Sequence, residues 1–246
     1  MIAPFRISKE TISHLPMVDF RYNTNFENRQ KSLDSSLKSY VYGDDGTLDG
    51  DAIQESWFPT DMRFDFFISH AHGDVKEAKR LANWLYTRLG MTSFIDFQIW
   101  GSADSLQRYI DEKNSQRTQK DITYKQTQDS SAHVHAMLSM ALMDAIDKSN
   151  FFIFIESNQS LRPFEPDVTN SPWLFEEIFI ANHIRRSVRK TKCFSETGRI
   201  NESRQNIVHA LKIDDYPTLT SYRIRTMDRL EDTNSVYNYL LSLHNK

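Results

Sequence analysis

The segment from Phe64 to Gly90 most constrains the fold, because it reads as a strand, a polar turn and a helix. Phe64 to Ile68 is a short, aromatic-rich apolar run, which is typical of a buried strand. Asp74 and Glu77 form a capping-box pattern at the start of the predicted helix, and Gly90 marks its end. Apolar residues recur between them at helical spacing: Val75, Ala78, Leu81, Ala82, Leu85 and Leu89.

The same alternation continues along the chain. Thr92 to Trp100 favours a second strand, an apolar stripe from Val134 to Ile146 indicates a helix, and Phe151 to Ile155 is a continuous apolar strand. Another helix follows, with Ser171 as its N-cap and Pro172 as its first residue. Strands that alternate with helices predict an α/β fold with a parallel sheet and helices on both faces.

Three segments fit this pattern less well. Residues 1–61 are polar with turn signals and are predicted to be an N-terminal extension of unknown role. Residues 113–130 form a long polar connection, which is predicted to be mobile in the resting protein. In the C-terminal third, 207–213 and 222–224 are predicted as short strands, and 234–244 as a helix.

Composition limits the class of protein. The net charge is -3, which argues against a general nucleic-acid-binding surface. Cys193 is the only cysteine, so no intramolecular disulfide is possible, and this fits a reducing cytoplasm. The first ten residues lack an apolar signal-peptide core, and no apolar run approaches the ~20 residues that span a bilayer. We therefore expect a cytoplasmic protein without a membrane anchor.

The candidate site lies where ligands bind in open parallel sheets, outside the carboxyl ends of the strands. Ser69 and His70 follow the first predicted strand, and Trp100 ends the second. The loop into the helix capped by Ser171 is expected on the same rim, and Trp173 and Glu177 lie four residues apart on one face of that helix. A carboxylate beside an indole can hold a sugar while the ring packs on a flat base.

Each of these residues has a plainer interpretation. Most acids on helices are solvated, and Trp173 and Trp100 can pack in the core or beneath a loop. Glu176 competes with Glu177, but only Glu177 has the four-residue spacing from Trp173. The basic cluster of Arg185, Arg186, Arg189, Lys190 and Lys192 is typical of a solvated face, and the alternative is a contact for an acidic partner.

Several other kinds of site find no support. His70 and His72, like His133 and His135, form His-x-His pairs, but no cysteine or carboxylate pattern completes a metal site. No nucleophile elbow, P-loop or G-x-G-x-x-G fingerprint is present. We therefore predict no metal and no separate cofactor.

Two of these motifs resemble those of the Toll/interleukin-1 receptor (TIR) domain. The strand that ends in Phe67-Ile68-Ser69-His70-Ala71 is similar to the first strand of bacterial TIR proteins. Trp173-x-x-x-Glu177 is similar to the helix that carries the catalytic glutamate of the NAD-cleaving members, and 96–101 resembles their second strand and BB loop. The resemblance covers residues 62–246 and implies a flavodoxin-like TIR domain after the extension.

The resemblance also implies a function. Glu177 would be the catalytic residue of an NAD+ nucleosidase or cyclase, with Ser69, His70, Trp100 and Trp173 as substrate-binding residues. The products would be nicotinamide and ADP-ribose, or a cyclic ADP-ribose-type signal read by an effector protein in antiphage defence, as in Thoeris systems. Self-association through TIR–TIR contacts is expected. Two alternatives stay open: a non-enzymatic assembly scaffold and a hydrolase similar to nucleoside deoxyribosyltransferases.

Overall fold

The computed structural model describes residues 2–16, 63–95, 107–108, 111, 124–165, 167–184 and 208–244. The chain divides into two compact units. The first contains the described residues up to 16, those from 63 to 95 and those from 145 onward. The second contains most of one long helix and the short segment around residue 107.

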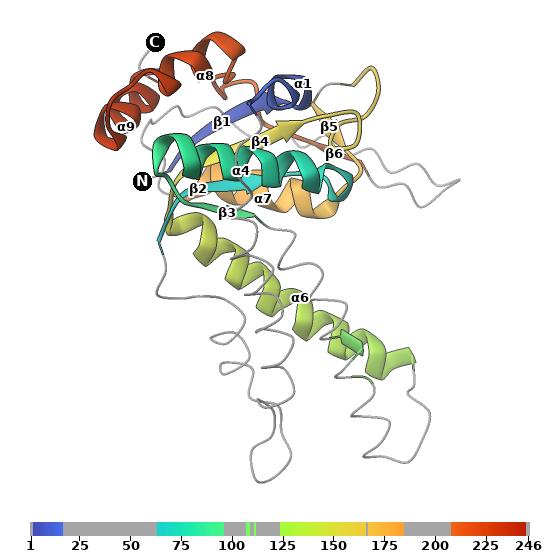
Figure 1. Cartoon of the computed structure of the whole chain (residues 1–246). Helices are drawn as coiled ribbons and strands as arrows, with labels where there is room; N and C mark the ends of the chain where they lie inside the picture. The colour runs from blue at the N-terminus through green and yellow to red at the C-terminus, as the bar shows by residue number, and fades with distance from the viewer. Residues whose placement is uncertain are drawn as a thin grey trace. The chain divides into compact units, whose positions relative to one another are not determined.

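A parallel four-stranded sheet forms the centre of the first unit (Figure 1). Its strands are β1 (Ala3–Ser8), β2 (Phe64–Ser69), β3 (Ser93–Ile95) and β4 (Ser149–Glu156), in the order β1-β4-β2-β3. Every neighbouring pair is parallel, and helices flank the sheet. The predicted α/β fold with a flavodoxin-like parallel sheet is therefore confirmed.

The first strand corrects the predicted domain organisation. β1 pairs with β4 along its whole length, from Ala3 opposite Phe151 to Ser8 opposite Glu156. On its other edge, the backbone of Arg6 exchanges hydrogen bonds with Pro217 and Leu219. The first residues therefore belong to the sheet and are not part of an extension that ends at residue 61.

Aromatic rings fill both sides of the sheet. Phe67 stacks on Phe94 and on Phe152, with ring centroids 5.6 Å apart in each pair. On the other side of the same strands, the ring of Phe151 packs against those of Phe66 and Phe5. Successive strand residues point to opposite faces, which is why one continuous apolar run supplies both layers.

Helices cover the two faces. α4 (Val75–Leu89) lies in front of the sheet in Figure 1, and α7 (Pro172–His183) lies behind it. α4 contacts β2 and β3, and it also contacts α1 (Lys9–Ser13) and α8 (Ser221–Asp228). α9 (Thr233–Ser242) ends the described chain and confirms the helix predicted there.

The C-terminal strand predictions are partly wrong. Tyr222 and Ile224 lie in helix α8, which Thr220 caps by accepting a hydrogen bond from the Arg223 amide. Ile224 and Met227 are buried three residues apart, so the segment follows helical spacing. Within the described part of the strand predicted at 207–213, which starts at residue 208, only β6 (His209–Ala210) forms a strand, and it pairs antiparallel with β5 (Val168–Thr169).

α6 (Tyr124–Asp147), which falls mostly in the second unit, has the predicted apolar stripe. Its buried apolar side chains, among those described, are Val134, Leu138, Ala141, Leu142 and Ile146. The helix begins earlier than expected, because residues 124–130 are helical although they were predicted to be part of the polar connection. The rest of that connection and Trp100 lie outside the described residues.

No described helix is long and apolar enough to cross a membrane.

Candidate functional site

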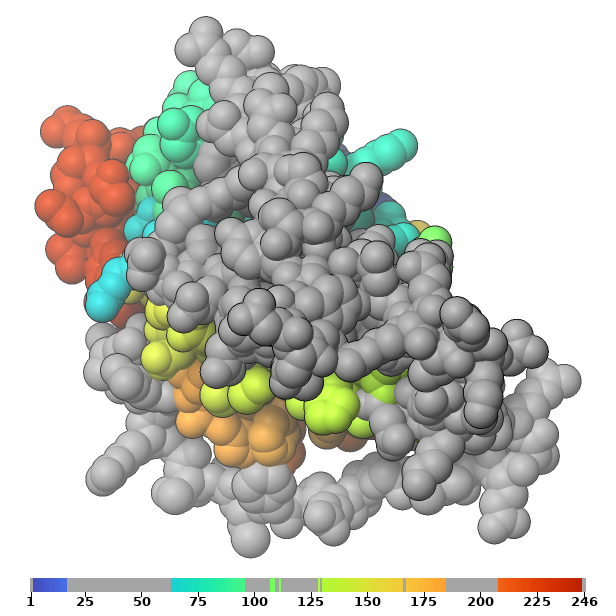
Figure 2. Space-filling view, turned by 90° about the horizontal axis from the view of Figure 1, so that it is seen from below, coloured from blue at the N-terminus to red at the C-terminus, as the bar shows by residue number. Residues whose placement is uncertain are grey.

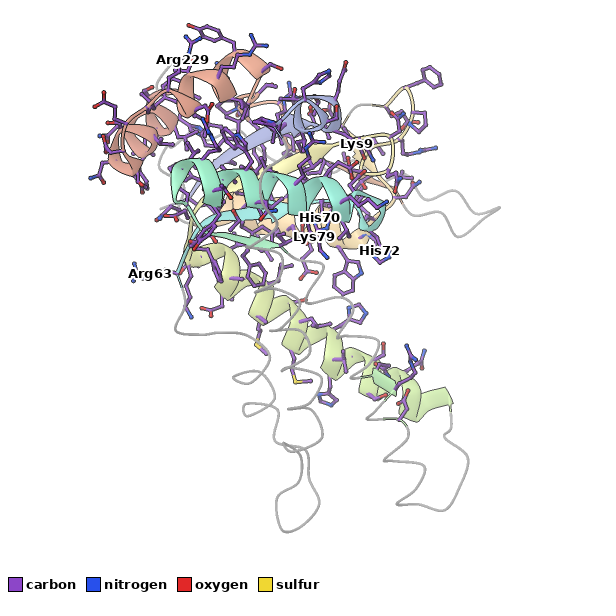
Figure 3. The ribbon with its side chains drawn as sticks, in the orientation of Figure 1. Lys9, Arg63, His70, His72, Lys79 and Arg229 are labelled. Carbon is purple, nitrogen blue, oxygen red and sulfur yellow. The ribbon has the colours of Figure 1, made fainter. Side chains whose placement is uncertain are left out.

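The candidate site begins at the carboxyl ends of β2, β4 and β1. Ser69 is the last residue of β2, and His70 and His72 follow it in the turn before α4. Figure 3 shows His70, His72 and Lys9 at one end of the sheet, while Arg63 marks the amino end of β2 at the other. The observed parallel register places the turn after β2 and the loop after β4 on one rim, as predicted, and it adds the segment after β1.

Glu177 lies on the buried side of α7. Ser171 caps this helix by accepting a hydrogen bond from the Leu174 amide at 3.3 Å, and Pro172 is its first residue, as predicted. The buried residues of α7 are Leu174, Glu177, Ile178 and Ala181, the spacing of a stripe that faces the core. Glu177 thus occupies a position where an apolar residue is normally found.

The burial of Glu177 is complete, with 0% of its surface exposed. Its neighbour Glu176 is half-buried. The outer side of α7 reaches the molecular surface (Figure 2), and Phe179 on this helix is exposed. Taking a carboxylate out of water is costly, so such groups concentrate at functional sites or in structural networks. The contrast with Glu176 supports the choice of Glu177 from the spacing.

A chain of contacts shows which side of the sheet faces α7. Phe67 stacks on Phe152, and the ring of Tyr216 meets Phe152 edge-on at 6.3 Å. The Tyr216 hydroxyl in turn donates a hydrogen bond to Asn182 of α7, at 3.3 Å. Because strand residues alternate, Ser69 lies on the same face of β2 as Phe67. Ser69 therefore points to the side of the sheet that α7 covers.

Ser69 and Glu177 each lie a short distance along their own element from this chain of contacts. Ser69 is two residues beyond Phe67 on β2, a rise of about 6.6 Å toward the rim. Glu177 precedes Asn182 by five residues, a rise of about 7.5 Å along α7. Both residues therefore lie on the α7 side of the sheet, Ser69 at the end of β2 and Glu177 on the buried side of α7.

Ser69 itself has an unusual environment. Its side chain has no exposed surface, and within the described part of the chain no hydrogen-bond partner reaches its hydroxyl oxygen. A buried hydroxyl without a partner lowers stability, so its presence calls for an explanation. His70 is buried as well, and its Nδ1 lies 3.4 Å from the Ile68 carbonyl oxygen.

The other predicted residues have varied outcomes. Trp173 is half-buried. His133 and His135 are both exposed on α6, and His72 is exposed while His70 is buried. Among the described residues, no three histidine, cysteine or acidic side chains gather in a group able to hold a metal ion.

A second carboxylate on the same face escaped the sequence analysis. Glu156 ends β4, and its Oε1 lies 3.3 Å from a guanidinium nitrogen of Arg6 in β1. Burial raises the pKa of Glu156, although Arg6 opposes that effect, and burial also raises the pKa of nearby Asp167. Arg6 was assigned to the extension, so no sequence signal linked it to Glu156.

Comparison with known proteins gives no family assignment, because no protein-family model, curated protein or solved structure matches the chain.

Proposed function

We propose that the protein cleaves the nicotinamide–ribose bond of NAD+ and that Glu177 is its catalytic residue. The observation that carries the proposal is a fully buried carboxylate in the core-facing stripe of α7, on the side of the sheet to which Ser69 points. The position of Ser69 at the carboxyl end of β2 supports it, because nucleotides bind at such rims of parallel sheets. The resemblance of the two motifs to TIR proteins supplies the substrate.

The chemistry suits a single carboxylate. Nicotinamide leaves NAD+ as a neutral molecule, so the reaction needs no general acid. The transition state resembles an oxocarbenium ion, as in glycoside hydrolysis. A fixed negative charge at Glu177 stabilises that cation, and the carboxylate also accepts hydrogen bonds from the ribose hydroxyls. The hydroxyl of Ser69 would find in the substrate the partner that the described residues do not offer.

The nucleophile that captures the cation decides the product. Water gives ADP-ribose, whereas an atom of the same molecule gives a cyclic isomer and another base gives an exchange product. We propose Trp173, which is half-buried beside the site, as a stacking surface for a base, and His70 and Trp100 as further substrate contacts. ADP-ribose or its cyclic isomer would serve as a signal for a separate effector in antiphage defence.

The burial of Glu177 bears on regulation. NAD+ cannot reach a side chain without exposed surface unless its surroundings rearrange. Self-association through contacts between copies of the domain would supply such a rearrangement. We therefore expect low basal turnover that rises with protein concentration, and a dilute monomer with full specific activity would contradict this part of the proposal.

The test is incubation of the purified protein with NAD+, with and without lysate of phage-infected cells, followed by mass spectrometry. Release of nicotinamide with an ADP-ribose-type product is the expected result. A parallel incubation with nucleosides tests the alternative of a deoxyribosyltransferase-like hydrolase. Assembly of the protein without any cleavage under either condition would favour the scaffold alternative.

A further inference from the structure

Three segments of the rim meet at one carboxylate. Asp74 lies in η1 (His72–Asp74), the single 3-10 turn between β2 and α4. The ammonium group of Lys9, which follows β1, lies 2.8 Å from Asp74 Oδ1. The hydroxyl of Ser157, which follows β4, donates a hydrogen bond to Asp74 Oδ2. We call Lys9, Asp74 and Ser157 the Asp74 clasp.

The clasp replaces the role that the sequence predicts for Asp74. No side-chain hydrogen bond caps the start of α4, so the expected capping box is not formed. Lys9 instead contacts both acids of that pattern, because its ammonium group also lies 3.2 Å from Glu77. Asp74 has no exposed surface, whereas the Lys9 side chain is 40% exposed. The clasp is therefore a charge-assisted contact that reaches from the surface to a buried acid.

The clasp also orders the loop that leads to α7. The hydroxyl oxygen of Ser157 accepts hydrogen bonds from the amides of Gln159 and Ser160, at 3.0 and 3.1 Å. Gln159 lies directly over Gly73, where an added Cβ would come 1.7 Å from its Oε1. The turn after β2 and the loop after β4 are thus packed against each other at the position of Asp74.

These two segments carry the two halves of the candidate site. The turn after β2 starts with Ser69 and His70, and the loop after β4 leads into the helix with Glu177. We infer that Lys9 is a positioning residue that, through Asp74 and Ser157, fixes the β2 turn relative to the loop before α7. The expected effect on catalysis rests on the proposed function. The claim that Lys9 holds the β2 turn against the loop before α7 does not depend on it.

A different role for Lys9 predicts different kinetics. If the exposed ammonium group bound a phosphate of the dinucleotide, its removal would raise KM and leave kcat unchanged. A positioning residue instead affects kcat, because misplacement of a catalytic group by about 1 Å can cost ~100-fold in rate. The two roles are therefore separable in one set of variants.

The experiment compares Lys9→Met, Lys9→Arg and Arg88→Met in the full-length protein. Arg88 provides the matched control, because it lies near the last residue of α4, away from the rim, and its Nε lies 2.7 Å from Asp228 Oδ1 of α8. We expect Lys9→Met to lower kcat for nicotinamide release about 10- to 100-fold with little change in KM. Lys9→Arg should restore most of the lost rate, and Arg88→Met should match the wild type.

Hydrogen exchange measures, without any substrate, whether Lys9 holds the β2 turn against the loop before α7. Lys9→Met should speed exchange of amides 70–76 and 157–161 and leave the far end of α4 unchanged. Raised KM with unaltered kcat, or wild-type kinetics and exchange in Lys9→Met, would overturn the inference. If the wild type releases no nicotinamide, the proposed function fails, and the exchange data alone decide whether the clasp joins the two segments.

Discussion

Removing the ring of Phe67 should test whether the core beneath the candidate site is packed as described. The ring has no exposed surface and stacks on both Phe94 and Phe152 at 5.6 Å. A Phe→Ala change in a core costs about 3–5 kcal/mol, and two lost ring contacts place Phe67→Ala near the upper end of that range. Phe67→Leu keeps most of the volume and should cost about 1–2 kcal/mol.

The assay is urea unfolding monitored by circular dichroism, with thermal melting as a second measurement. A domain of ordinary stability has about 5–15 kcal/mol, so Phe67→Ala should remain folded with a melting temperature roughly 10–20 °C lower. Phe164→Ala is the matched control, because that ring is fully exposed and its loss should change stability by less than about 0.5 kcal/mol. A loss below about 2 kcal/mol for Phe67→Ala would refute the stacked arrangement on which the position of Ser69 depends.

Two further variants separate stability from activity and test a charge. Ser69→Ala removes a buried hydroxyl that has no partner among the described residues, so it should leave the free energy of unfolding unchanged or raise it by about 1 kcal/mol. The same variant should slow NAD+ cleavage. A clear loss of stability in urea unfolding would contradict this. Burial raises the pKa of Glu156 above its ordinary value of 4.5. The contribution of this group to the free energy of unfolding is therefore fully present below pH 4.5 and is lost as pH rises through the folded-state pKa. Glu156→Gln should therefore melt higher than the wild type at pH 7 and equal to it near pH 4, and a lower melting temperature at pH 7 would show that the pair with Arg6 outweighs burial.

Local patterns predicted α4, α6, α7 and α9, but they missed α1 and assigned part of α8 to a strand. The apolar spacing of α4 and the left-handed Gly90 that ends it, at φ 67°, both agree with the sequence prediction. The cap at Ser171 and the buried stripe of α6 agree too. These features depend on residues within a few turns of one another, so a sequence shows them directly.

Contacts between distant residues were the ones missed. β1 is short, contains Pro4 and joins β4 about 150 residues later, so no local signal identified it as a strand of the sheet. The partners of Asp74 are Lys9 and Ser157, both remote in sequence, and their attraction overrides its predicted role as a helix cap. The burial of Glu177 follows its position in the core-facing stripe, which its spacing from Trp173 alone did not reveal.

The central claim is tested most directly by nicotinamide release from NAD+ in Glu177→Gln and Glu176→Gln, each compared with the wild type. Glutamine keeps the shape of glutamate and a similar helix propensity, so both variants should fold. Loss of the charge at Glu177 should lower the rate about 10²- to 10³-fold. Glu176→Gln should retain nearly full activity, since Glu176 lies about 100° around the helix. Wild-type turnover in Glu177→Gln, with an active parent protein, would contradict the account.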